Sequence, residues 1–259
     1  MDFRTVEENL RASFRVLAAS RSTGEVREAP GVSIASAGVT FQMFNAAFLS
    51  APVEDERELN RRIATAREHF AARQQAWSYW VCEDWLDKKA RRSVAVTFKK
   101  NGLHLATVLP GMLAEKLAAP IRPLPRLEVR PVSDRETWTH FCQIGALCFN
   151  VPLGWFQEVF DDAKVWKSGF KGYVGYSKDE PVSTAGIVVA AGALGVYNVA
   201  TVPTQQKRGF GETVMRHALA LAREQHGAQR SVLQSTAQGF ELYRRMGYSV
   251  VTHVAVYTS

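Results

Sequence analysis

The stretch from Ala193 to Gln225 joins an uncharged, β-branched run to a glycine-containing loop and then to an amphipathic segment. The run "ALGVYNVATV" is typical of a buried strand, and the segment from Gly209 to Gln225 has helical periodicity. One face of that predicted helix is apolar and carries Val214, Ala218, Leu221 and Ala222. Where a strand passes to a helix in this way, the first helical N–H groups lack partners and lie at the positive end of the dipole. The sequence therefore predicts an anion site at the loop.

The composition of the loop favours a phosphate or diphosphate as the anion. Gly209 and Gly211 carry no Cβ that would keep a ligand from the backbone, and Lys207 and Arg208 add positive charge at the edge. Two common phosphate loops do not fit. Gly211 is not followed by Lys-Ser/Thr as in a Walker loop, and Val214 stands where a dinucleotide fingerprint has its third glycine. On these residues alone, a glycine-rich turn without a ligand stays an alternative.

Four prolines between Ala119 and Pro131 indicate a linker, and we divide the chain into residues 1–125 and 126–259. In the second half we predict strands at 126–134, 170–177, 183–191, 193–202, 231–236 and 248–258, with helices at 135–149 (capped by Asp134), 154–160, 209–225 and 239–246. The first half is expected to contain helices at 7–19 and 55–75 and strands around Val39, Trp80 and Val94. The fold class is therefore α/β, in the sense of a mixed α+β sheet.

Two motifs in the second half resemble a known family. The run "QKRGFG" at 206–211 matches the Gln/Arg-x-x-Gly-x-Gly/Ala signature of the GNAT superfamily, the acyl-CoA-dependent N-acetyltransferases, and "ELYRRMGY" at 241–248 is similar to its Leu-Tyr-x-x-x-Gly-Phe/Tyr segment. The resemblance covers residues 127–259 and implies a GNAT-like fold there. The first half lacks the signature. Its length and character suit a tandem, degenerate GNAT-like domain, with an unrelated lid as the alternative.

The resemblance also implies a site. Acetyl-CoA would be the co-substrate, its diphosphate held by the loop and its pantetheine by the preceding strand, which separates from its neighbour beyond "SVLQST". The implied coenzyme-binding residues are Val199, Ala200, Thr201, Gln206, Lys207, Arg208, Gly209, Phe210, Gly211, Glu212 and Thr213. Tyr243 would be the general acid that protonates the leaving thiolate, or else a core tyrosine. Arg244 or Arg245 would approach the adenosine phosphates, unless they are only solvated.

A general base is not evident, because the strand at 193–202 contains no carboxylate. Tyr197 and Asn198 are the polar residues there, and either would at most orient a water. We therefore expect an N-acetyltransferase that moves an acetyl group by direct attack onto a primary amine of a small molecule or peptide. A non-catalytic acyl-CoA sensor is the alternative.

Composition limits the other function classes. The net charge of +7 is spread over both halves without a long basic block, so no nucleic-acid partner is expected. Three cysteines without paired spacing predict no disulfide framework and no metal site.

The N-terminus lacks a signal-peptide core, and glycines interrupt the uncharged stretch at 181–206, so no membrane association and a cytoplasmic location are predicted. The aromatic run "WSYWVCEDW" is interpreted as core rather than a ligand cage. A monomer or homodimer is expected.

Overall fold

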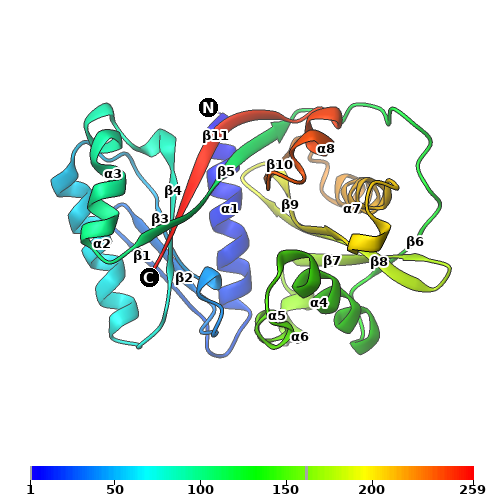
Figure 1. The fold of residues 1–259 in the computed structure, drawn as a ribbon, viewed down its shortest axis with the longest axis horizontal. Helices are drawn as coiled ribbons and strands as arrows, with labels where there is room; N and C mark the ends of the chain where they lie inside the picture. The colour runs from blue at the N-terminus through cyan, green and yellow to red at the C-terminus, as the bar shows by residue number, and fades with distance from the viewer. Residues whose placement is uncertain (1, 161–162) are drawn as a thin grey trace.

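The computed structural model describes residues 2–160 and 163–259, which form one mixed, eleven-stranded sheet. The strand order is β1-β2-β3-β4-β11-β5-β10-β9-β8-β7-β6. Figure 1 shows the two halves of the chain on either side of the long helix α1 (Asp2–Ala19), with the crossing strands β5 and β11 between them. The α/β class and the mixed sheet are confirmed.

The first half begins with α1 and an antiparallel meander, and a helix then leads to a parallel strand. Its further elements are β1 (Glu25–Ala29), β2 (Val32–Ser36), η1 (Gln42–Phe44), β3 (Asn45–Leu49), α2 (Glu56–Ala71), β4 (Ser78–Cys82), η2 (Glu83–Trp85), α3 (Lys88–Lys100) and β5 (His104–Ala114). The predicted helices at 7–19 and 55–75 are confirmed, as is the strand around Trp80.

The second half follows the predicted order closely. It contains β6 (Glu128–Pro131), α4 (Arg135–Phe149), α5 (Leu153–Phe160), α6 (Ala163–Lys167), β7 (Phe170–Ser177), β8 (Glu180–Ala190), β9 (Ala193–Thr201), η3 (Pro203–Gln205), α7 (Phe210–His226), β10 (Ser231–Gln234), α8 (Phe240–Arg245) and β11 (Ser249–Thr258). Asp134 caps α4 as predicted and forms a capping box with Thr137. The uncharged stretch at 181–206 forms β8 and β9, and none of the helices in the described residues is long and apolar enough to cross a bilayer.

The two halves exchange their last strands. Strand β5 ends the first half but pairs with β10 of the second, at Gln234↔Gly111 among other positions. Strand β11 ends the second half but pairs with β4 of the first, at Val254↔Cys82 among others. The exchanged strands also pair with each other along most of their length. Because backbone hydrogen bonds cross the junction twice, the sheet continues without an edge between the halves.

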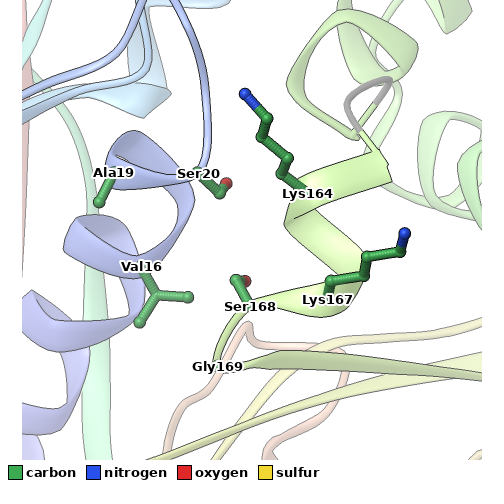
Figure 2. A pocket seen from close by; sticks show the side chains of 7 residues that line it. All are labelled: Val16, Ala19, Ser20, Lys164, Lys167, Ser168 and Gly169. Carbon is green, nitrogen blue, oxygen red and sulfur yellow. The ribbon is translucent and has the colours of Figure 1, made fainter.

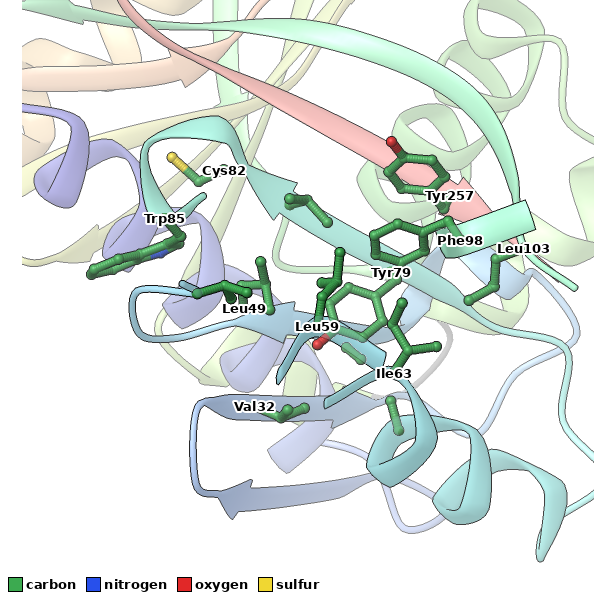
Figure 3. Packing of buried hydrophobic residues seen from close by; sticks show 14 of the residues in the cluster. Val32, Leu49, Leu59, Ile63, Tyr79, Cys82, Trp85, Phe98, Leu103 and Tyr257 are labelled. Atoms are coloured by element: carbon green, nitrogen blue, oxygen red, sulfur yellow. The ribbon is translucent and has the colours of Figure 1, made fainter. Parts of the chain in front are cut away.

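Helices cover both faces of this sheet. Helix α1 packs against strands of both halves, through Leu10 and Phe14 on one side and Val6 on the other. Helices α4 and α5 cover the outer part of the same face, whereas α7 and α8 cover the opposite face of the second half. In the first half α2 and α3 enclose an aromatic core around Tyr79, Phe98 and Tyr257, which Figure 3 shows in close view. The tryptophans of "WSYWVCEDW" are buried there and in the core beneath α1, so their interpretation as core is confirmed.

Several predictions for the first half were wrong. Val94 lies in α3, whose Asp87 cap and buried Ala90, Thr97 and Phe98 favour a helix over a strand. Val39 lies in a bend between β2 and η1. Strands β1, β2, β3 and β5 were missed. For β5 the reason is that its first half is mostly exposed and lacks a clear alternation of apolar and polar residues.

Asn9 of α1 connects the first half to the second through its side chain. Its Nδ2 donates to the carbonyl oxygens of Ala190 (2.9 Å) and Ala193 (3.1 Å), at the turn between β8 and β9. Its Oδ1 accepts from the Tyr197 hydroxyl at 2.6 Å. Gly195 lies directly under this amide, where any Cβ would overlap it. A buried polar residue in a helix is thus fully paired by the strand end of the other half.

We expect Asn9→Ala to lower the free energy of unfolding by about 2–4 kcal/mol, because it removes buried hydrogen bonds to the Tyr197 hydroxyl and to the carbonyls of Val188, Ala190 and Ala193. Chemical denaturation measures this change. Glu8→Ala, on the exposed side of the same helix, serves as the control and should cost well under about 1 kcal/mol. Equal effects of the two substitutions would contradict the role assigned to Asn9.

Candidate functional site

Strands β9 and β10 run parallel but pair over only two residue positions. The pairs are Ser231↔Leu194 and Val232↔Gly195. Beyond them each strand keeps its other neighbour, β10 through Gln234↔Gly111 and β9 through Thr201↔Ser183. The two strands therefore separate toward their carboxyl ends. Separation beyond "SVLQST" was expected, and the pairing ends earlier, at Val232.

A bulge accompanies the separation. The register between β8 and β9 shifts between Thr184↔Ala200 and Gly186↔Tyr197, and Asn198 adopts a left-handed conformation with φ of 49°. The Thr184 hydroxyl donates to the Asn198 carbonyl at 2.9 Å and holds the bulge. A bulge locally increases twist and bends its strand, which is how β9 turns away from β10.

The loop after β9 presents unpaired backbone N–H groups. Within the described residues, no hydrogen bond is donated by the backbone N–H groups of residues 207–212. Lys207 and Gly209 both have positive φ, 61° and 89°, and no side chain caps α7. Alternation of such conformations turns successive amides toward one side. The positive end of the α7 helix dipole lies at the same point. The loop therefore has the donors and the electrostatic field that a diphosphate requires.

The two loop glycines have different structural tasks. Gly209 needs its positive φ, and a Cβ there would lie 3.0 Å from Cδ of Pro125. Gly211 is buried, and a Cβ there would lie 3.0 Å from the Thr201 hydroxyl, on the side of the sheet. Gly211 thus lets the start of α7 approach β9 closely, which positions the loop amides beside the strand end.

The other predicted coenzyme-binding residues surround the same point. The side chains of Lys207 and Arg208 are exposed, and Arg208 also stacks over Phe210 at 5.1 Å from the ring centre. Gln206 donates to the Thr201 carbonyl at 3.2 Å and accepts from Gln238 at 3.0 Å.

Some of the predicted groups are already engaged. Glu212 pairs with Arg216 at 2.8 Å, and the Thr213 hydroxyl donates to the Gly209 carbonyl at 3.0 Å. The Ala200 carbonyl accepts from Ser183, and that of Thr201 from Cys148 and Gln206, so Val199 has the one carbonyl of the three without a side-chain donor in the described chain.

Tyr243 lies on α8, the helix that follows β10, and packs in the core beneath α7 and α8. Burial raises the pKa of its phenol above the ordinary value, so the group is protonated at neutral pH. Within the described residues its hydroxyl has no hydrogen-bond partner, whereas that of Tyr248 is paired with Ser231 at 2.7 Å. Tyr243 is therefore a buried, protonated tyrosine of α8 whose hydroxyl is not engaged by another described residue. Arg244 and Arg245 are exposed.

The polar groups expected to orient a water differ in availability. The Tyr197 hydroxyl is bound to Asn9, and burial raises its pKa, so it is not free to act as a base. The Asn198 side chain remains partly exposed and unpaired in the described structure. Sequence reasoning missed Asn9, which comes from the other half of the chain, and Gln234, whose buried Nε2 has no partner among the described residues. Gln234 lies two residues beyond Val232, the last position at which β10 pairs with β9, and the sequence alone does not show where that pairing ends.

One further carboxyl group has an altered proton affinity. Burial raises the pKa of Glu7 to about 7, against the opposing effect of Arg11, which binds it through Nε at 2.8 Å and Nη2 at 3.1 Å. This fork engages both carboxylate oxygens, so Glu7 is not free to accept a proton from a substrate.

Other features lie away from the loop. Figure 2 shows a shallow groove between α1 and α6, lined by Val16, Ala19, Ser20, Lys164, Lys167, Ser168 and Gly169. Cys82 and Cys142 are buried and Cys148 is half-buried. In the described ranges no three His, Cys, Asp or Glu residues are arranged to hold a metal ion.

Residues 168–250 match a family model described as "Acetyltransferase (GNAT) domain". This segment contains the separating strands, the loop and Tyr243, so the similarity to a GNAT domain covers the candidate site. Family and fold support acyl transfer as the general class of activity. No curated protein shows significant sequence similarity to the chain.

Solved structures share the fold over nearly the whole chain. A GCN5-related N-acetyltransferase from Kribbella flavida is 19% identical, with a TM-score of 0.71 over 96% of this chain and 94% of that one. A functionally unknown conserved protein from Staphylococcus epidermidis is 12% identical, with a TM-score of 0.66 over 91% and 94%. A putative GNAT-family acetyltransferase from Novosphingobium aromaticivorans is 13% identical, with a TM-score of 0.55 over 98% and 97%. At these identities the similarity shows the fold.

We expect Gly209→Ala to destabilise the protein more than Gly227→Ala. Both glycines have positive φ, which costs an alanine about 1–2 kcal/mol, but the new Cβ at 209 would also press on Pro125, whereas 227 has open space around it. The free energies of unfolding from urea denaturation measure the difference. Equal losses of unfolding free energy in the two variants would show that Pro125 moves aside without an energetic cost.

Proposed function

We propose that the protein is an N-acetyltransferase that moves an acetyl group from acetyl-CoA to a primary amine of a small molecule or peptide. The observation that carries the proposal is the separation of β9 and β10 directly beside a loop of unpaired backbone amides. Such a site binds an extended carrier along the strands and its diphosphate at the helix start. The match of residues 168–250 to a GNAT domain supports the same assignment.

The donor is proposed to bind through main-chain groups. The amides from Lys207 to Glu212 would hold the diphosphate, and Lys207 and Arg208 would add charge at its edge. Pantetheine would follow β9 from Val199 to Thr201 and place the thioester where the strands have separated. The free N–H groups and the gap in backbone pairing fit the two polar parts of such a ligand.

Transfer begins with a neutral amine, and deprotonating a lysine-like amine at pH 7 costs roughly 4 to 5 kcal/mol. Its nitrogen attacks the thioester carbonyl, the C–S bond breaks, and the thiolate takes a proton. Tyr243 is proposed to supply that proton, since its phenol is protonated and unpaired. The amine gives up one proton to water, and a proton from water restores the Tyr243 phenol, so the reaction ends with amide, thiol and neutral tyrosine. With Tyr197 engaged and Glu7 bound by Arg11, positioning of an already neutral amine would carry most of the rate.

The first half, residues 1–125, is proposed to be a degenerate copy of the second, residues 126–259. Both halves contain an antiparallel meander, a helix that leads to a parallel strand, a shorter helix and an exchanged strand. In the first half the parallel strands do not stay apart, because Val53 forms a parallel bridge with Leu86.

The helix start of the first half is also unsuited to an anion. Asp55 caps α2 and accepts from the Glu58 N–H, while Glu56 and Glu58 place negative charge in the first turn. Arg62, which is buried, turns its guanidinium to the carbonyls of Ala51 and Pro52. The copy would therefore bind no acyl-CoA and would instead shape the acceptor side through α1.

Calorimetry with CoA and a thiol-release assay with acetyl-CoA and a panel of amines test the proposal. We expect binding in the micromolar range, and Arg208→Glu should weaken it about tenfold by placing a carboxylate beside the diphosphate. Lys171→Glu changes the net charge equally at the exposed position of the otherwise mostly buried strand β7 and should leave affinity within about twofold. Absence of CoA binding to the unaltered protein would refute the proposal. Binding without turnover on any amine would favour the non-catalytic acyl-CoA sensor.

Tyr243→Phe should lower kcat by about 10²–10⁴-fold with the Kd for CoA changed by less than about twofold, because only the proton donor is removed. Steady-state kinetics and calorimetry on the same variant separate the two quantities. Tyr248→Phe removes a hydroxyl that is paired with Ser231 and serves as the control for loss of a buried phenol. An unchanged kcat in Tyr243→Phe would remove its acid role.

A further inference from the structure

The linker between the halves lies against the phosphate-loop end of α7 and the end of α8. Ala118 donates its N–H to the Met246 carbonyl at 2.9 Å, and its own carbonyl accepts from Arg216 Nη2 at 2.8 Å. Seven residues later, Pro125 lies against Gly209. The segment 118–125, here called the strap, is thus fixed at both of its ends.

Arg122 is the cation of the strap. Its Nη2 donates to the Lys207 carbonyl at 3.0 Å, so its guanidinium lies beside the row of unpaired amides that begins at Lys207. That single bond uses one of the five N–H donors of an arginine. Within the described residues no carboxylate pairs with Arg122, and the side chain is exposed. An arginine held by a carbonyl at one nitrogen presents its remaining fork to an incoming oxyanion.

The charges around this point favour an anion. Lys207 and Arg208 are exposed and likewise lack a carboxylate partner in the described chain. The nearest acidic residue along the loop, Glu212, is neutralised by Arg216. Three cations from two separate segments therefore meet at the start of α7, without the acidic partners that an ion-pair network would supply.

We infer that Arg122 is a further donor-binding residue, which contacts a phosphate group of the acyl carrier from the linker side. This inference rests on the function proposed above and adds the strap as a second wall of the phosphate site. The carrier has a diphosphate and a 3′-phosphate, and both offer the same oxyanion chemistry. Phosphate binding by Arg122 needs no covalent step, so its effect belongs to affinity and not to the rate of transfer.

A purely structural role for Arg122 predicts a different pattern. If the arginine only pins the strap through Lys207, its loss lowers the stability of the free protein and weakens binding without regard to salt. If it contacts phosphate, the free protein keeps its stability, and the loss of affinity shrinks as salt screens the charge. The two roles are therefore separable with the full chain and no acceptor.

The experiment is calorimetric titration of the full chain with CoA and with dephospho-CoA at roughly 50 mM and 500 mM salt. Arg122→Gln should weaken CoA binding about fivefold to twentyfold at low salt and clearly less at high salt. Arg122→Lys should recover part of the loss, because it keeps the charge but not the fork. Arg126→Gln, an exposed arginine that makes no hydrogen bond to the loop in the described structure, should bind as the unaltered protein does.

The outcomes distinguish this inference from the function on which it rests. A loss confined to CoA assigns Arg122 to the 3′-phosphate, and an equal loss with dephospho-CoA assigns it to the diphosphate. Unchanged affinity in Arg122→Gln overturns the inference while the donor site stands. A lowered melting temperature of the free variant with a salt-independent loss also overturns it. If the unaltered protein binds neither ligand, the proposed function fails and the inference falls with it.

Discussion

The exchange of β5 and β11 is the constraint on which the rest of the structure depends. Two parallel strands of one sheet normally stay paired, because separating them leaves backbone groups without partners. Here β10 is held by β5 from the first half, and β9 by β8, so each strand keeps one complete ladder. The free-energy cost of separating β9 from β10 therefore comes only from the unpaired backbone groups on the two strand edges that face each other. A coenzyme that follows the strands would satisfy those same edges.

The two halves use the same arrangement with opposite results. In the first half the bridge between Val53 and Leu86 rejoins the parallel strands, and the Asp55 carboxylate satisfies the start of α2. In the second half the strands stay apart, and α7 begins at a glycine that offers no cap. An acidic cap and an anionic ligand compete for the same N–H groups at a helix start. The N–H groups at the start of α2 are therefore satisfied by the protein itself, whereas those at the start of α7 are left for a ligand.

The sequence predicted the second half well because its signals are local. Asp134 as a cap, the glycine loop before α7 and the β-branched runs of β8 and β9 each act within a few residues, and α4 has the predicted bounds. In the first half, local signals were weaker, and the basic helix around Val94 was mistaken for a strand. Strand exchange is invisible to such reasoning, because β5 finds its partners more than a hundred residues away. The same distance hid Asn9, whose partners Ala193 and Tyr197 belong to the other half.

Long-range placement also determines what the candidate site lacks. The residues that sequence reasoning considered for proton transfer, Tyr197 and Asn198, lie on adjacent positions of β9, but only Tyr197 is bound by α1. Helix α1 lies on the face of the sheet opposite α7 and α8. On α1, Asn9 is hydrogen-bonded to the β8–β9 turn and Glu7 is bound by Arg11, so neither side chain is available as a general base. The proposed mechanism, in which the acceptor amine is already neutral when it binds, would need no such base.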